Sequence, residues 1–260
     1  MPINIPVKQN EKLEALLERV QRDEELNQLW RCANVNAVNR LHMSDHGYVH
    51  VKIVANLSLK LLRLLVDAGI DPGIVTDHAL RREDAEVVVV LASLLHDVGL
   101  SVHWDHHEVY SVFIANERLP GLLAGLYEKD ELVVVQSEIL HAIVAHGGST
   151  RCLTLEAGIV KVANALDMSQ GRSRIPFEAG SVNIHSVSAQ AIDKVDLKKG
   201  DAKPVNIEVH MNNSAGIYQL DHLLKHKLEA SGLAPHIEVT ARVEGETDKR
   251  LIHLYNFNAE

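Results

Sequence analysis

Apolar and polar residues alternate with the period of an α-helix over the first 175 residues. Residues 10–40 are a charged, amphipathic stretch. The pattern then predicts a helix from near His46 to Gly69, which places His50 on the apolar face. Further helices are predicted over about residues 83–96, 105–118, 130–146 and 154–170, each followed by a glycine or a proline.

The period changes after residue 180. Val205–Met211 alternates strictly between apolar and polar residues, as a half-buried strand does. A strand through Val195 and Leu197 and a turn over 198–203 precede it, and a helix (214–232) and a strand (237–243) follow, with another strand near 251–257. We therefore expect a mainly α fold with a helical domain at 1–175 and a small α+β domain at 176–260.

Composition narrows the class of protein. The chain has 260 residues, of which 46% are hydrophobic and 23% charged, as in an ordinary globular protein. Lys and Arg number 26 against 35 Asp and Glu, and the acidity is spread over both parts, so we expect no duplex nucleic acid as partner. The longest apolar stretch, Val87–Leu95, has nine residues, whereas a membrane span needs about 20.

The expected cellular compartment rests on the N-terminal sequence and on the two cysteines. The N-terminus lacks an apolar core of signal-peptide length, and the two cysteines, Cys32 and Cys152, form no paired motif. These features are typical of a reducing compartment and exclude a thiolate zinc site. We therefore expect a cytoplasmic protein that does not contact membranes.

Histidine is unusually frequent, and its distribution points to metal chemistry. Ten of the 16 histidines lie between residues 42 and 146. The segment 83–96 could be a strand because it holds four consecutive valines, but its acidic start and the following Gly99 favour a buried helix. His96 and Asp97 end this helix. A charged pair there is costly unless a partner such as a metal compensates for it, and a simple helix cap is the alternative.

Other candidate ligands lie on separate predicted helices. His50 is on an earlier helix, and Asn164 and Asp167 are three residues apart on the last helix, hence on one face. The remaining candidates, on or near the helices that follow His96, are His107, His141 and His146. This mixture of imidazole and carboxylate suits divalent Mn, Fe, Co, Ni or Zn.

These residues resemble the HD superfamily of metal-dependent phosphohydrolases over about residues 40–170. The family order, His … His-Asp … Asp, is matched by His50, by Leu95-His96-Asp97-Val98-Gly99 and by the last helix, Val160-Lys-Val-Ala-Asn164-Ala-Leu-Asp167. The resemblance implies an HD-type helical bundle in which His50, His96 and Asp97 hold a divalent metal. The family's closing Asp falls on Asn164, so either Asn164 or Asp167 closes the site.

The resemblance also implies an activity and further site residues. HD proteins hydrolyse phosphate esters, here of a nucleotide or related metabolite, with metal-activated water. Some hold a second metal, for which His107 and His146 match loosely and His141 is a further candidate. Asp97 and His107 are the expected catalytic residues. From their place after the last helix, Arg172 and Arg174 are candidates for binding phosphate, although a solvated helix end explains them equally well.

Two other functions stay open. Asn164 and the C-terminal domain would also suit a regulatory module that binds metal or nucleotide without catalysis, and a purely structural bundle would bind no metal at all. The expected partner is a small phosphorylated substrate. An edge strand in the C-terminal domain could pair with a second copy to make a homo-oligomer.

Overall fold

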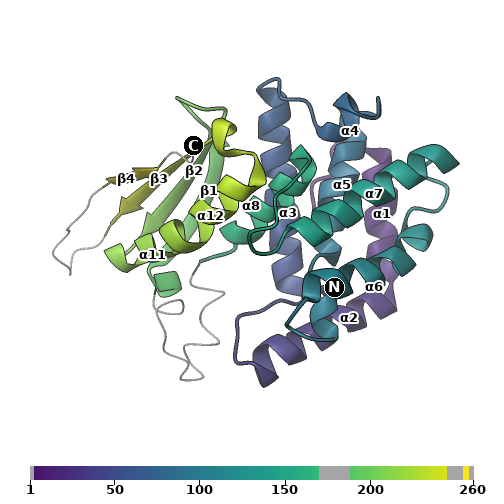
Figure 1. Ribbon diagram of the computed structural model, residues 1–260, viewed down its shortest axis with the longest axis horizontal. Helices are drawn as coiled ribbons and strands as arrows, with labels where there is room; N and C mark the ends of the chain where they lie inside the picture. The colour runs from purple at the N-terminus through teal and green to yellow at the C-terminus, as the bar shows by residue number, and fades with distance from the viewer. Residues whose placement is uncertain (1–2, 170–187, 245–253, 258–260) are drawn as a thin grey trace.

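The computed structural model describes residues 3–169, 188–244 and 254–257 (Figure 1). Its α-helices are α1 (Glu11–Arg22), α2 (Glu24–Asn34), α3 (Tyr48–Asp67), α4 (Gly73–Thr76), α5 (Arg82–Leu95), α6 (His107–Leu122), α7 (Lys129–Ala145), α8 (Leu155–Leu166), α11 (Ile217–Gln219) and α12 (His226–Ser231). The strands are β1 (Ile192–Lys199), β2 (Val205–Met211), β3 (Ile237–Val243) and β4 (Leu254–Phe257). The predicted fold class, mainly α with a small C-terminal α+β region, is confirmed. The predicted boundary at 175/176 lies outside the described residues.

Helix α5 is the centre of the helical part. It packs against α1, α3, α7 and α8, and its residues from Val87 to Leu95 are buried. The four valines are therefore helical, as predicted. Valine lowers helix propensity by about 0.5 kcal/mol relative to alanine, whereas burial of a valine side chain contributes about 1.5–3 kcal/mol. Burial on every side therefore outweighs the local preference for a strand.

Several helix boundaries differ from the prediction. The last helix, predicted over 154–170, ends at Leu166, so Asp167 lies just beyond it and not on the same helix face as Asn164. The stretch 10–40 is divided at Asp23, whose carboxylate accepts the Leu26 N–H and caps α2, and it ends in a π-helical turn, Val35–Arg40. The end of α6 before Pro120 was predicted wrongly, because the helix continues to Leu122. A proline so near the end of a helix removes only one backbone hydrogen bond, which the following residues tolerate.

The strands form one sheet in the order β1-β2-β3-β4. β1 and β2 are an antiparallel hairpin, β3 is parallel to β2, and β4 is antiparallel to β3. The parallel pair requires a crossover, which contains α11, a π-helical turn (Leu220–Lys225) and α12. Inward residues of β2 and β3, such as Ile207 and its partner Val239, are buried. The predicted strands are confirmed.

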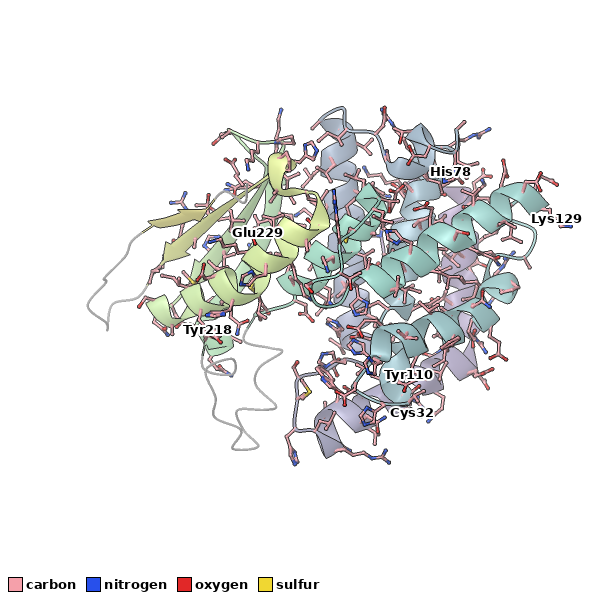
Figure 2. All side chains as sticks on the ribbon, viewed as in Figure 1. Cys32, His78, Tyr110, Lys129, Tyr218 and Glu229 are labelled. Atoms are coloured by element: carbon pink, nitrogen blue, oxygen red, sulfur yellow. The ribbon has the colours of Figure 1, made fainter. Side chains whose placement is uncertain are left out.

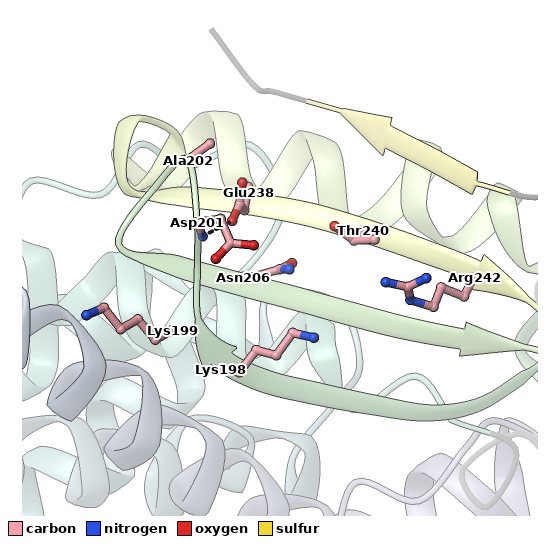
Figure 3. A pocket seen from close by; sticks show the side chains of 8 residues that line it. All are labelled: Lys198, Lys199, Asp201, Ala202, Asn206, Glu238, Thr240 and Arg242. Carbon is pink, nitrogen blue, oxygen red and sulfur yellow. Dashed lines mark hydrogen bonds between the residues drawn. The ribbon is translucent and has the colours of Figure 1, made fainter.

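The other face of the sheet is polar. Glu208 accepts hydrogen bonds from Lys198 Nζ (2.6 Å) and Arg242 Nε (2.7 Å), and these cations lower the pKa of Glu208 to about 2. A groove of about 490 Å³ lies on this face and is lined by Lys198, Lys199, Asp201, Ala202, Asn206, Glu238, Thr240 and Arg242 (Figure 3). Two of its cations, Lys198 and Arg242, are thus engaged by Glu208.

The sheet region joins the helical part through α8. Helix α12 packs on α8, and the Cys152 N–H donates to the Ala230 carbonyl (3.0 Å). Gly158 on α8 permits this approach, because a β-carbon there would overlap the Ser231 carbonyl oxygen. One hydrophobic core accordingly continues from the helices into the sheet. Among the described residues, no helix is both long and apolar enough to cross a bilayer.

The close approach at Gly158 can be tested against a glycine with open space around it. We expect Gly158→Ala to lower the free energy of unfolding by about 1–3 kcal/mol, because the new methyl group overpacks the contact with α12. At Gly121 on α6, nothing lies within 4 Å of the position that a β-carbon would take, so Gly121→Ala should instead stabilise the helix by about 0.5–1 kcal/mol. Urea denaturation measures both, and equal effects of the two substitutions would contradict the tight junction.

Candidate metal centre

Four imidazoles surround the carboxylate of Asp97. His50 Nε2 and His96 Nε2 lie 3.3 and 3.2 Å from Asp97 Oδ2. His107 Nε2 and His146 Nε2 each lie 3.5 Å from the other oxygen, Oδ1. Asp97 therefore belongs to two groups of three residues, and each of its oxygens faces one pair of histidines.

Helix ends bring these residues together. His50 is in the first turn of α3, His96 follows the last residue of α5, His107 begins α6, and His146 follows the last residue of α7. Tyr110, labelled in Figure 2, marks the first turn of α6. The His-Asp pair is thus placed where α5 stops, and the ends of the neighbouring helices meet it there.

A glycine lets α6 approach the His-Asp turn. Asp97 is followed by a 3₁₀ turn, Val98–Ser101, in which the Gly99 N–H donates to Ser111 Oγ (2.8 Å). A β-carbon at Gly99 would overlap the backbone carbonyl of His107. Gly99 therefore does more than end the preceding helix, since it also brings His107 within reach of Asp97.

Hydrogen bonds fix which nitrogen of each ring carries the proton. Three rings direct Nδ1 to backbone carbonyls: His96 to Ser93 (2.8 Å), His107 to Trp104 (2.9 Å) and His146 to Ile143 (2.6 Å). His50 directs Nδ1 to Asp167 Oδ2 (2.6 Å). These oxygens accept, so Nδ1 donates, and a neutral ring then has its lone pair on Nε2. Four lone pairs therefore face the carboxylate of Asp97.

Burial keeps the centre in this state. It lowers the pKa of His96 to about 4 and also lowers that of His146, so both rings are neutral near pH 7. Burial by itself raises the pKa of Asp97, and the adjacent imidazoles hold it well below its usual range only where they are charged or donate a proton from Nε2. Beside neutral rings that present lone pairs, a bound cation is the group that would keep this carboxylate ionised.

This set of atoms fits a divalent metal. Asp97 Oδ2 is buried and has no hydrogen-bond partner among the described residues. Within each group, the facing atoms all lie within 4.8 Å of one another: His50, His96 and Asp97 in the first, and Asp97, His107 and His146 in the second. A cation would compensate the buried negative charge and the converging lone pairs. Three protein ligands per ion would leave positions open for water or substrate.

Other predicted residues lie outside the two groups. His141 is on α7, and its Nε2 accepts a hydrogen bond from the Leu153 N–H (3.0 Å). It does not belong to either group of facing atoms. Asn164 is half-buried, and its side chain makes no hydrogen bond within the described part of the chain. Asp167 contacts His50 through Nδ1, the nitrogen that faces away from the groups. Arg172 and Arg174 lie outside the described residues.

The sequence pattern did not reveal the role of Lys161. Its ammonium group is buried and donates to the carbonyls of Gly147, Gly148 and Thr150 at 2.9, 3.0 and 2.9 Å. Burial lowers the pKa of Lys161, but three carbonyl acceptors stabilise the charged form. Lys161 thus fixes the turn that follows His146. A lysine inside the apolar run 157–166 was the available signal for a buried cation.

Aromatic rings border the centre. His46 is buried, and its ring centroid lies 5.3 Å from that of His50 and 5.6 Å from that of Trp104. The half-buried Trp104 ring also lies 5.5 Å from the ring of His107, at an interplanar angle of 31°. His107 is the most accessible of the four histidines around Asp97, with 14% of its side chain exposed. Trp104 and His46 therefore border the most accessible part of the centre.

Comparison with known proteins agrees with this geometry. The HD domain family matches residues 47–169, which contain both groups. An uncharacterized protein of Methanocaldococcus jannaschii, MJ1020, is 40% identical over 231 residues, which cover 89% of each chain. No solved structure matches this chain. The chain belongs to the HD superfamily, whose domains are generally those of metal-dependent hydrolases.

Elemental analysis of the purified protein tests the two groups. We expect up to two divalent ions per chain, and we expect His96→Ala and Asp97→Ala to remove most of the metal, since Asp97 faces both groups. His107→Ala should retain about one ion fewer than the wild type. His141→Ala should retain the full complement because its ring is engaged elsewhere. Full metal content in both His96→Ala and Asp97→Ala would contradict the assignment of the site.

Proposed function

We propose that this protein hydrolyses a phosphate ester of a nucleotide or related metabolite in a reaction that depends on divalent metal. The observation that supports this proposal most is the shared carboxylate of Asp97, with two pairs of histidine lone pairs facing its two oxygens. The candidate ions are Mn, Fe, Co, Ni and Zn, because these accept imidazole and carboxylate together. One or two ions would be bound.

Asp97 and the four histidines around it have the central role in the proposed reaction. A bound divalent ion supplies Lewis-acid polarisation of a phosphoryl oxygen and a lowered pKa for water. Asp97 and the four histidines around it would hold the ion or ions in a dry, preorganised setting. His107 was also expected to transfer a proton. Its Nδ1 donates to Trp104 and its Nε2 faces Asp97, so this geometry favours a ligand role for His107.

Trp104 supports a nucleotide as the substrate class. Its half-buried indole lies beside His107, and an aromatic face next to a phosphate-binding metal suits a nucleobase. Stacking of a base on an aromatic side chain contributes about 1–3 kcal/mol. Arg172 and Arg174 remain proposed phosphate-binding residues. We further propose a cytoplasmic location, a small phosphorylated substrate and assembly into a homo-oligomer.

Phosphate release from a panel of esters with Mn²⁺ tests the activity. We expect the wild type to hydrolyse nucleoside monophosphates better than ribose 5-phosphate, and we expect Trp104→Leu to remove this preference by raising KM for the nucleotides alone. His96→Ala should lower kcat/KM by at least about 100-fold, since metal activation contributes several kcal/mol. His222→Ala, at an exposed residue of the crossover, is the control with unchanged rate. Absence of turnover across the panel would contradict the proposed hydrolysis.

A second function, binding of metal and nucleotide without catalysis, is favoured by Asn164. This residue stands where the HD pattern has a carboxylate, and an amide oxygen is a weaker ligand because it has no charge. We expect Asn164→Asp to tighten Mn²⁺ binding, measured by calorimetry, and to raise the rate of phosphate release. A variant that binds Mn²⁺ more tightly without any turnover would support the binding module over the enzyme.

A further inference from the structure

Asp167 lies on the side of the His50 ring that faces away from the metal groups. Its Oδ2 is 2.6 Å from His50 Nδ1, whereas His50 Nε2 is 3.3 Å from Asp97 Oδ2 and 3.3 Å from His96 Nε2. The two nitrogens of an imidazole point in divergent directions. A carboxylate oxygen on Nδ1 therefore does not share an ion with the lone pair on Nε2, and Asp167 belongs to neither group of facing atoms among the described residues.

The bond lies in dry surroundings and joins distant parts of the chain. The His50 side chain is fully buried and that of Asp167 is 6% exposed. A hydrogen bond to a carboxylate in such surroundings is about twice as strong as one between neutral groups. It connects α3 with the end of α8, two helices that pack against each other. The orientation of the His50 ring is therefore fixed from α8.

His50 differs in this respect from the other rings of the centre. His96, His107 and His146 each donate Nδ1–H to a backbone carbonyl, whereas His50 donates to a side chain with negative charge. A carboxylate behind a ligating histidine fixes the ring tautomer and makes the opposite nitrogen a better electron donor. The first group thus contains a histidine whose Nε2 is made a stronger ligand by the carboxylate that binds its Nδ1–H.

We propose that Asp167 is a positioning residue that sets the tautomer, orientation and basicity of His50 for metal binding, and that it is not itself a ligand. The proposal rests on the proposed metal-dependent function. It assigns the first ion three protein ligands, His50, His96 and Asp97. It also separates Asn164, which is on α8, from Asp167, which lies just beyond the end of α8: Asp167 acts through His50, and Asn164 stands at the family's closing position.

Calorimetric titration with Mn²⁺ and nitrogen NMR of histidine-labelled apo protein test this role together. For Asp167→Ala we expect unchanged stoichiometry at saturation but an affinity weakened by about 10–100-fold. The downfield Nδ1–H signal of His50, assigned by its loss in His50→Ala, should also disappear. Asp167→Asn keeps an acceptor without the charge, so it should retain the signal and bind with intermediate affinity. Circular dichroism confirms that each variant is folded.

The matched control is Asp97→Asn, which alters a proposed ligand and should therefore lower the Mn²⁺ stoichiometry in the same titration. If Asp167→Ala lost an equivalent of Mn²⁺ at saturation, Asp167 would be a ligand and the proposal would be overturned. Unchanged affinity in a folded Asp167→Ala variant would overturn it as well, as would a wild type that binds no Mn²⁺. A protein that shows the expected dependence on Asp167 but hydrolyses no ester would contradict the proposed function and leave this role standing.

Discussion

The buried carboxylate of Asp97, with histidine Nε2 lone pairs facing both of its oxygens, determines how the rest of the site is arranged. Asp97 is almost fully buried, and the neutral rings that surround it present Nε2 without a proton. Such an arrangement is unfavourable by itself, because burial of a charge costs several kcal/mol without compensation. A divalent cation removes this cost. The electrostatics of the buried cluster therefore favour a bound cation at this position.

The helices around Asp97 are held by contacts that only small residues permit. Gly99 admits the start of α6, and Gly147 lies so close to the Glu108 carboxylate that a β-carbon there would overlap it. Lys161 then fixes the turn after His146 from α8. These contacts have a common effect: they fix the ends of α5, α6 and α7 relative to one another, and the imidazoles with them.

Helix α8 links the metal centre with the C-terminal region. It provides Lys161, and the chain at its end provides Asp167, which binds the ring of His50. Its other side packs on α12 through Gly158. The sheet is therefore attached to the helix that orients two histidines of the site.

Apolar periodicity was enough to predict the helical class, the later α+β region and most element positions, because it depends on local geometry and on which face is buried. The pattern also pointed to His50, a histidine on an apolar helix face, and to the His96-Asp97 pair, since a charged pair at the end of an apolar helix needs compensation. The remaining features depend on how the helices pack. Position along the chain did not tell which of His141 and His146, or of Asn164 and Asp167, faces the site. The direction of a side chain depends on how the helices pack. Only the packed helix ends show that His146 faces Asp97, that His141 binds a backbone amide instead, and that Asp167 reaches His50 from behind.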